Sequence, residues 1–181
     1  MQLETNRLIL REYVEDDWRR VQEYRSEARY LRYYSEEASS EDRAREFVQM
    51  VMGWAAEQPR QKFQLAVTRT SDGMVIGSCG VRITSPEDRE AEFGCELDPQ
   101  EWGKGYASEA SLAIIDYGFR VLGMHRIWAH TIGDNLAAVK LAERMGMKLE
   151  GRLRERRFFK GRWWDRVIYA VLEQEWRCNS V

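Results

Sequence analysis

Hydrophobic and polar positions along this chain follow two periods, one of strands and one of helices. Alternating or continuous apolar runs predict seven strands, at residues 3–13, 63–69, 74–84, 91–97, 126–132, 148–159 and 162–173. Helical spacing predicts four helices, at residues 14–28, from 39 to a point before Pro59, 108–122 and 136–145. The order of these elements predicts an α/β fold with a central sheet of mixed strand direction.

Turn residues separate these elements. Ser71, Asp72 and Gly73 predict a hairpin turn between two strands, and Gly146 predicts a left-handed end to the last helix. Residues 30–37 are aromatic and polar and are expected to form a loop.

Composition limits the class of protein. A chain of 181 residues with 44% hydrophobic residues is expected to form one domain, residues 1–181, with a real core. The net charge of −2 favours neither a nucleic-acid nor an anionic-membrane partner, and no apolar run is long enough to span a bilayer. The first residues do not resemble a secretory signal. The chain has three scattered cysteines, Cys79, Cys95 and Cys178, so we expect neither a disulfide framework nor a metal site. This cysteine usage fits a protein of the reducing cytoplasm.

The loop between the strand at 91–97 and the helix at 108–122 is the most informative segment. Gly103 and Gly105 let the backbone approach a ligand closely, and the following helix begins with unpaired amides and a positive dipole end. Such a loop suits a phosphate or pyrophosphate. It lacks the spacing of a nucleotide-binding P-loop, and Ser108 stands where a dinucleotide fingerprint needs its third glycine, which disfavours a nucleotide-dependent oxidoreductase.

A third pattern, Gln/Arg-x-x-Gly-x-Gly/Ala, fits Gln100, Gly103 and Gly105, and through it the chain resembles the GNAT superfamily of N-acetyltransferases. The chain is most similar to the branch of ribosomal-protein alanine N-acetyltransferases (RimJ/RimL-like). Further motifs of that branch stand in order at residues 5–11, 92–97, 123–127, 135–154 and 164–176. The resemblance therefore covers essentially the whole chain.

The resemblance implies a single-domain GNAT fold, with a mostly antiparallel sheet splayed between its fourth and fifth strands. It implies that acetyl-CoA binds in that gap and passes its acetyl group directly to a primary amine of a protein N-terminus or a small molecule. The implied acetyl-CoA-binding residues are Cys95, Glu96, Leu97, Gln100, Trp102, Gly103, Lys104, Gly105, Tyr106, Ala107, Ser108 and Asn135. Asn135 is equally well placed to cap the helix that follows it. Homodimers are common in this branch, and the oligomeric state stays open.

Acetyl transfer needs an acceptor amine without its extra proton, and three side chains are candidate general bases. Glu92 and Glu96 share one face of the fourth strand because strand side chains alternate, and Glu92 is the preferred one. His130 lies on the fifth strand, and an imidazole is a side chain suited to general-base catalysis. Each of the three also has a purely structural interpretation: the glutamates as solvent-facing or salt-bridged strand residues, and His130 as a packed strand residue. The expected acceptor-binding residues are aromatic, namely Tyr33, Tyr34, Trp54 and Phe159.

The chain also departs from its relatives. Ala142 stands where many carry a tyrosine that protonates the leaving thiolate, Ala138 replaces a serine, and Trp128 replaces a glutamate. These departures leave no dedicated general acid and make a ribosomal-protein substrate an unsafe assumption. They also motivate an alternative function, a CoA- or acyl-CoA-binding regulatory module without turnover.

Overall fold

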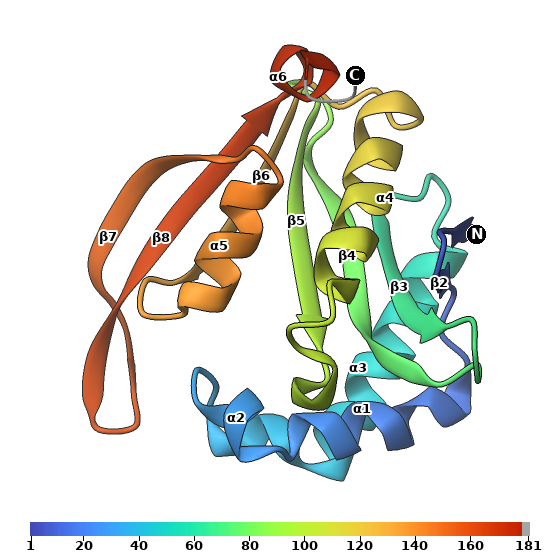
Figure 1. Cartoon of the computed structure of the whole chain (residues 1–181), viewed down its shortest axis with the longest axis vertical. Helices are drawn as coiled ribbons and strands as arrows, with labels where there is room; N and C mark the ends of the chain where they lie inside the picture. Colours follow the sequence, from blue (N-terminus) through green and yellow to red (C-terminus); the bar gives the residue numbers. More distant parts are fainter. Residues whose placement is uncertain (179–181) are drawn as a thin grey trace.

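One eight-stranded sheet organises the computed structural model, which describes residues 1–178 and side chains as far as Trp176. The strand order is β1-β2-β3-β4-β5-β6-β8-β7, and neighbours are antiparallel except for the parallel pair β5 and β6 (Figure 1). The strands are β1 (Gln2–Glu4), β2 (Leu8–Arg11), β3 (Lys62–Arg69), β4 (Val75–Ser85), β5 (Glu90–Leu97), β6 (Arg126–Ile132), β7 (Lys148–Phe159) and β8 (Arg162–Leu172).

The described residues form six α-helices and three short 3-10 turns around this sheet. The helices are α1 (Trp18–Arg25), α2 (Ala28–Leu31), α3 (Glu41–Ala56), α4 (Tyr106–Arg120), α5 (Leu136–Arg144) and α6 (Glu173–Cys178). The turns are η1 (Glu15–Asp17), η2 (Glu36–Ser39) and η3 (Pro99–Glu101). Among these described residues, no helix combines the length and the apolar character needed to cross a membrane.

The α/β fold and the mixed sheet are confirmed, with two local corrections. The predicted strand at 3–13 is wrong as one element, because the chain reverses after Glu4 and Leu3 pairs with Leu10 across a hairpin. The predicted loop at 30–37 is also partly wrong, because α2 and η2 extend into it. The hairpin gives the sheet eight strands rather than seven. The short helices α2 and α6 bring the α-helices of the described residues to six rather than four.

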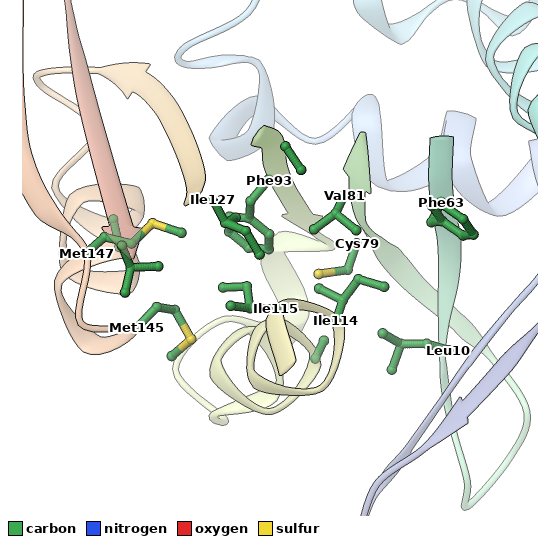
Figure 2. Packing of buried hydrophobic residues seen from close by; sticks show 14 of the residues in the cluster. Leu10, Phe63, Cys79, Val81, Phe93, Ile114, Ile115, Ile127, Met145 and Met147 are labelled. Atoms are coloured by element: carbon green, nitrogen blue, oxygen red, sulfur yellow. The ribbon is translucent and has the colours of Figure 1, made fainter. Parts of the chain in front are cut away.

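The two faces of the sheet carry separate hydrophobic clusters. On one face α4 packs over β4 and β5, where Ile114 and Ile115 contact the cluster that contains Cys79 and Phe93 (Figure 2). On the other face α1 and α3 cover β3 and β4. Side chains of β5 alternate between these two environments, so Phe93 and Cys95 face the α4 core while Glu92 and Glu96 face the other side.

The sheet opens between β5 and β6. The two strands pair only from Glu90 to Glu92 on β5 and from Arg126 to Trp128 on β6. Beyond these residues β5 continues to Leu97 and β6 to Ile132 without pairing to each other, and Figure 1 shows them diverging from the α6 end of the molecule. The expected splay is therefore present, and it leaves backbone groups and side chains of both strands along a gap.

Candidate active site

Two adjoining cavities lie along the gap. The first, of about 270 Å³, lies between β5 and β6 and is lined by Glu92 and His130. The second, of about 410 Å³, extends from the end of β5 past the glycine loop to α5. They share Tyr34, Cys95, Glu96, Asn135, Ala138 and Leu141. The cavities therefore meet at the end of β5, and together they form one cleft.

The glycine loop closes one end of the second cavity. Gly103 has a φ of +79° and Gly105 a φ of +84°, so both adopt the left-handed backbone that favours glycine. Helix α4 begins immediately afterwards at Tyr106. Within residues 1–178, the amides of residues 103–108 donate no hydrogen bond to the protein. Unpaired amides at the positive end of a 15-residue helix form an anion site, and these residues fit a pyrophosphate.

A carboxylate braces this loop from behind. Glu109 accepts hydrogen bonds from Thr5 Oγ1 at 2.6 Å and from the Arg7 amide at 2.8 Å, and it forms an ion pair with the Arg7 guanidinium. Arg7 Nη1 also donates to the Lys104 carbonyl at 2.9 Å. Burial opposes the charge of Glu109, but the hydrogen bonds from Thr5 and Arg7 outweigh it and lower the pKa of Glu109. The β1–β2 hairpin thus holds the glycine loop in position.

Glu96 is held by a ring of donors. Arg25 Nη2 lies 2.6 Å from Glu96 Oε1, Tyr24 Oη donates to the same oxygen at 2.9 Å, and Tyr30 donates to Oε2. Burial raises the pKa of the Tyr30 hydroxyl, and the nearby Glu96 carboxylate adds to the shift. All of these donors come from α1 and α2, so Glu96 joins this helical layer to β5. A carboxylate so fully hydrogen-bonded is a poor choice for a proton acceptor.

Glu92 and His130 form a pair of titratable side chains in the cleft, separate from the cluster around Glu96. Nδ1 of His130 on β6 lies 3.1 Å from Oε1 of Glu92 on β5, so the pair spans the splay. Arg82 Nη2 lies 3.4 Å from the other oxygen of Glu92, and Arg82 is oriented by Gln64 at 2.7 Å. The hydrogen bond from His130 is the main reason that the pKa of Glu92 is lowered, against an opposing contribution from burial. The carboxylate fixes one imidazole nitrogen and leaves Nε2 as the available base.

Tyr34 lies where the cavities meet. Its ring stacks on Tyr30 with centroids 4.6 Å apart, and burial raises the pKa of its hydroxyl to about 12, with a further contribution from Glu96. The phenol is therefore protonated across the physiological range. Ala138 lines both cavities and Ala142 lines the first, at the positions where the sequence lacks the serine and tyrosine of its relatives.

Most of the predicted ligand residues line the cleft. The second cavity is lined by Tyr33, Tyr34, Cys95, Glu96, Leu97, Trp102, Gly103, Gly105, Tyr106, Ala107, Ser108 and Asn135. Asn135 also accepts a hydrogen bond from the Ala138 amide at 3.3 Å, so its capping role is real. Cys95 lies directly across from Cys79 on β4, and both are free thiols, while the Cys178 side chain lies outside the described side chains.

Four predicted residues are not brought into the two cavities. Gln100 donates to Glu27 at 2.9 Å, and Lys104 pairs with Glu101 at 3.0 Å beneath the loop. Trp54 packs against the α1–α3 cluster, and Phe159 stacks on Trp164 with centroids 5.0 Å apart. Their residue types are suited to binding acetyl-CoA or an acceptor, but their side chains contact other side chains of the protein outside the two cavities.

The residues that position the acids were not predicted from the sequence. Arg82 pairs with Glu92 across β4 and β5, a contact that follows from strand register once the β4–β5 pairing is known. Arg25 and Arg7 act on carboxylates 71 and 102 positions away in the chain. No local signal in the sequence marks these two arginines.

Comparisons with known proteins agree with this geometry. Residues 7–148 match the family described as Acetyltransferase (GNAT) domain. The chain is 34% identical over 182 residues to the uncharacterized N-acetyltransferase YnaD of Bacillus subtilis (strain 168), covering 97% of this chain and 99% of that protein.

Two solved structures extend the likeness to the fold. A GNAT-family acetyltransferase from Bacillus anthracis superposes with a TM-score of 0.82 at 28% identity, covering 96% of this chain and 99% of that one. A spermidine N-acetyltransferase from Vibrio cholerae, in complex with CoA and spermine, superposes with a TM-score of 0.80 at 26% identity, with the same coverage.

Proposed function

Because the chain belongs to the GNAT acetyltransferase family, we propose that its Glu92–His130 pair deprotonates a primary amine that attacks acetyl-CoA bound in the second cavity. The family makes the chain an acetyl-CoA-dependent N-acetyltransferase, and residues 1–181 are taken as one catalytic domain. The observation that carries the proposal is the continuity of the cleft. It has unpaired amides at one end and an imidazole held by a carboxylate at the other.

In this proposal the glycine loop and the start of α4 bind the pyrophosphate of acetyl-CoA through the amides of residues 103–108. The pantetheine arm then lies along the unpaired edge of β5, where Cys95 and Leu97 offer backbone groups. Asn135 contributes from the start of α5, which closes the other side of the cavity. The thioester reaches the junction where the two cavities meet.

The chemical step is a direct transfer within a ternary complex. Nε2 of His130 takes a proton from the acceptor ammonium, while Glu92 holds Nδ1 and balances the positive charge that forms. The amine nitrogen then forms a bond to the thioester carbonyl carbon, the carbon–sulfur bond breaks as the thiolate leaves, and the nitrogen releases its second proton to water. A thiolate is a tolerable leaving group, so water is sufficient to supply its proton. The RimJ/RimL-like branch remains a proposal that rests on the sequence motifs.

Two measurements test this function. Acetyl-CoA titrated into the protein by calorimetry is expected to bind at one site per chain. A set of amines that includes peptides, amino acids and polyamines is then assayed for thiol release above the hydrolytic background. Binding without thiol release with any amine would favour the alternative of a regulatory module, and absence of binding would reject both.

A further inference from the structure

The last hairpin forms a strongly basic arm, defined here as residues 152–166. The arm carries seven arginines and lysines against two acidic residues, a net charge of +5, whereas the whole chain carries −2. Its strand β7 is exposed along nearly all of its length. Positive charge is thus concentrated on one protruding element, while the remainder of the molecule is acidic.

The basic arm continues the face of the sheet that carries His130. His130 pairs with Ile168 and Ile132 pairs with Arg166 across β6 and β8, so His130 and Arg166 point to the same side. Arg157 pairs with Trp164, two positions before Arg166, and shares that side. Burial lowers the pKa of Arg166, and repulsion from Arg157 and Arg156 lowers it further, while attraction to Glu92 opposes the shift. Arg166 is therefore within electrostatic reach of Glu92, and Arg156 and Arg157 are within reach of Arg166.

Among the described residues, four guanidinium groups of the arm form no ion pair: that of Arg154, which attracts Asp165, and those of Arg156, Arg157 and Arg166. Arg152 pairs with Asp165 at 3.0 Å, and Arg162 pairs with Asp134 at 2.7 Å. Like charges held together without counterions form a site for an anionic group.

The acidic residues of the cleft are already neutralised by cations. Glu92 pairs with Arg82, Glu96 pairs with Arg25, and a further carboxylate beneath the glycine loop pairs with Arg69. No described cavity carboxylate is left without a cation to bind a second ammonium group of an acceptor. The turn η2, which carries the exposed acids Glu36 and Glu37, lies against α1 and α3, and neither acid lines a cavity.

We propose that the acceptor is an amine borne by an anionic molecule, whose carboxylates contact the guanidinium groups of Arg156, Arg157 and Arg166. This inference rests on the proposed function and adds the charge class of the acceptor. A polyamine in the same place would set its remaining ammonium groups against these cations. The acceptor class therefore differs from the spermine that accompanies CoA in the Vibrio cholerae structure.

The test compares three peptide acceptors that differ mainly in the charge of their side chains. Three peptides have an N-terminal alanine followed by three glutamates, three glutamines or three lysines, and free glutamate and spermidine are assayed beside them. We expect kcat/KM for the glutamate peptide to exceed that for the glutamine peptide at least tenfold at low salt, with the lysine peptide and spermidine slowest. High salt should narrow the differences because it screens exposed charges. The faster of the glutamate peptide and free glutamate identifies the source of the carboxylates.

A pair of double variants locates the effect. Arg156→Gln/Arg157→Gln should raise KM for the glutamate peptide at least fivefold and leave the glutamine peptide unchanged. Arg43→Gln/Arg120→Gln removes the same charge from exposed positions on α3 and α4 and should change neither. Faster acetylation of spermidine or the lysine peptide by the unmodified enzyme would overturn this inference alone, as would equal effects of the two variants. Absence of thiol release with every amine would overturn the proposed function as well.

Discussion

Two glutamates on one strand have different uses because different partners reach them. Glu92 and Glu96 share a face of β5, as the sequence predicted. Glu96 is fixed by Arg25 and two tyrosine hydroxyls from the helical layer. Glu92 instead contacts His130 across the splay and keeps a side chain that is about 20% exposed. The first arrangement stabilises the fold, and the second suits the role of proton acceptor that we propose.

The two roles separate under substitution. His130→Ala is expected to lower kcat by roughly 100-fold or more, the usual scale for a lost general base. Glu92→Gln should lower kcat and should lower the melting temperature less than Glu96→Gln does, because Arg82 lies 3.4 Å from Glu92 whereas Arg25 lies 2.6 Å from Glu96. Glu96→Gln leaves Arg25 without its charge partner in a half-buried site, and it should lower the melting temperature markedly. Steady-state kinetics and thermal denaturation of the three variants check this. A loss of less than tenfold for both Glu92→Gln and His130→Ala would contradict the assignment.

The sequence placed these acids, and it preferred Glu92 only through the family resemblance. Strand alternation put Glu92 and Glu96 on one face, and the family resemblance put His130 on the facing strand. The ranking depends on Arg25, Tyr24 and Tyr30, which approach from α1 and α2 and are at least 66 positions distant from Glu96. Contacts of that kind are set by tertiary packing, and no local period of the sequence encodes them.

At the scale of elements, the turn between β5 and α4 depends on the left-handed backbone of its glycines. Gly105 precedes the helix with a φ of +84°, and a Cβ there would lie 3.2 Å from Arg7 Nη2. The left-handed backbone turns the following amides toward the cavity, and Arg7 fixes the Lys104 carbonyl behind it. The turn is thus held by the β1–β2 hairpin as much as by its own glycines.

Gly105→Ala is expected to weaken acetyl-CoA binding at least tenfold and to destabilise the fold by roughly 1 kcal/mol, because the new side chain strains the backbone and displaces Arg7. Calorimetric titration and urea denaturation measure the two effects. Gly73→Ala is a matched control, since Gly73 has a φ of +70° with nothing within 4 Å of its missing Cβ. The control should lose similar stability and keep its affinity. Unchanged affinity in Gly105→Ala would argue against pyrophosphate binding at this loop.

Sequence periodicity predicted the long elements well and the short ones poorly. The strands around 63–84 and the helices α3 and α4 carry strong periods and lie close to where they were predicted. The stretch 3–13 was predicted as one strand because both arms of its hairpin are apolar, and the reversal depends on pairing between Leu3 and Leu10. Trp54 and Phe159 were expected in the acceptor site, yet each packs on neighbouring side chains that only the folded chain supplies.

At the scale of the molecule, the same carboxylates serve stability and the site. Glu92 and Glu109 both have a lowered pKa in the fold. A lowered pKa means that the unfolded chain binds protons more readily than the folded one as the pH falls. The stabilisation by these groups is therefore complete at pH 7, above the ordinary glutamate pKa of about 4.3. This stabilisation is lost as the pH falls through the lowered pKa values that these carboxyl groups have in the fold.

Glu109 allows that argument to be tested, because it joins the β1–β2 hairpin to the first turn of α4. Glu109→Gln should reduce the free energy of unfolding at pH 7. The difference in this free energy from the unmodified protein should shrink below about pH 4.5, where the Glu109 carboxylate of the unfolded chain begins to be protonated. Urea denaturation from pH 7 to pH 3 measures the difference. Glu46→Gln, which removes an exposed ion pair with Arg43 on α3, should change stability little at any pH. Because Glu109 also positions Arg7 behind the glycine loop, Glu109→Gln should weaken acetyl-CoA binding at pH 7. A constant difference in stability across the pH range would show that Glu109 acts through packing rather than charge.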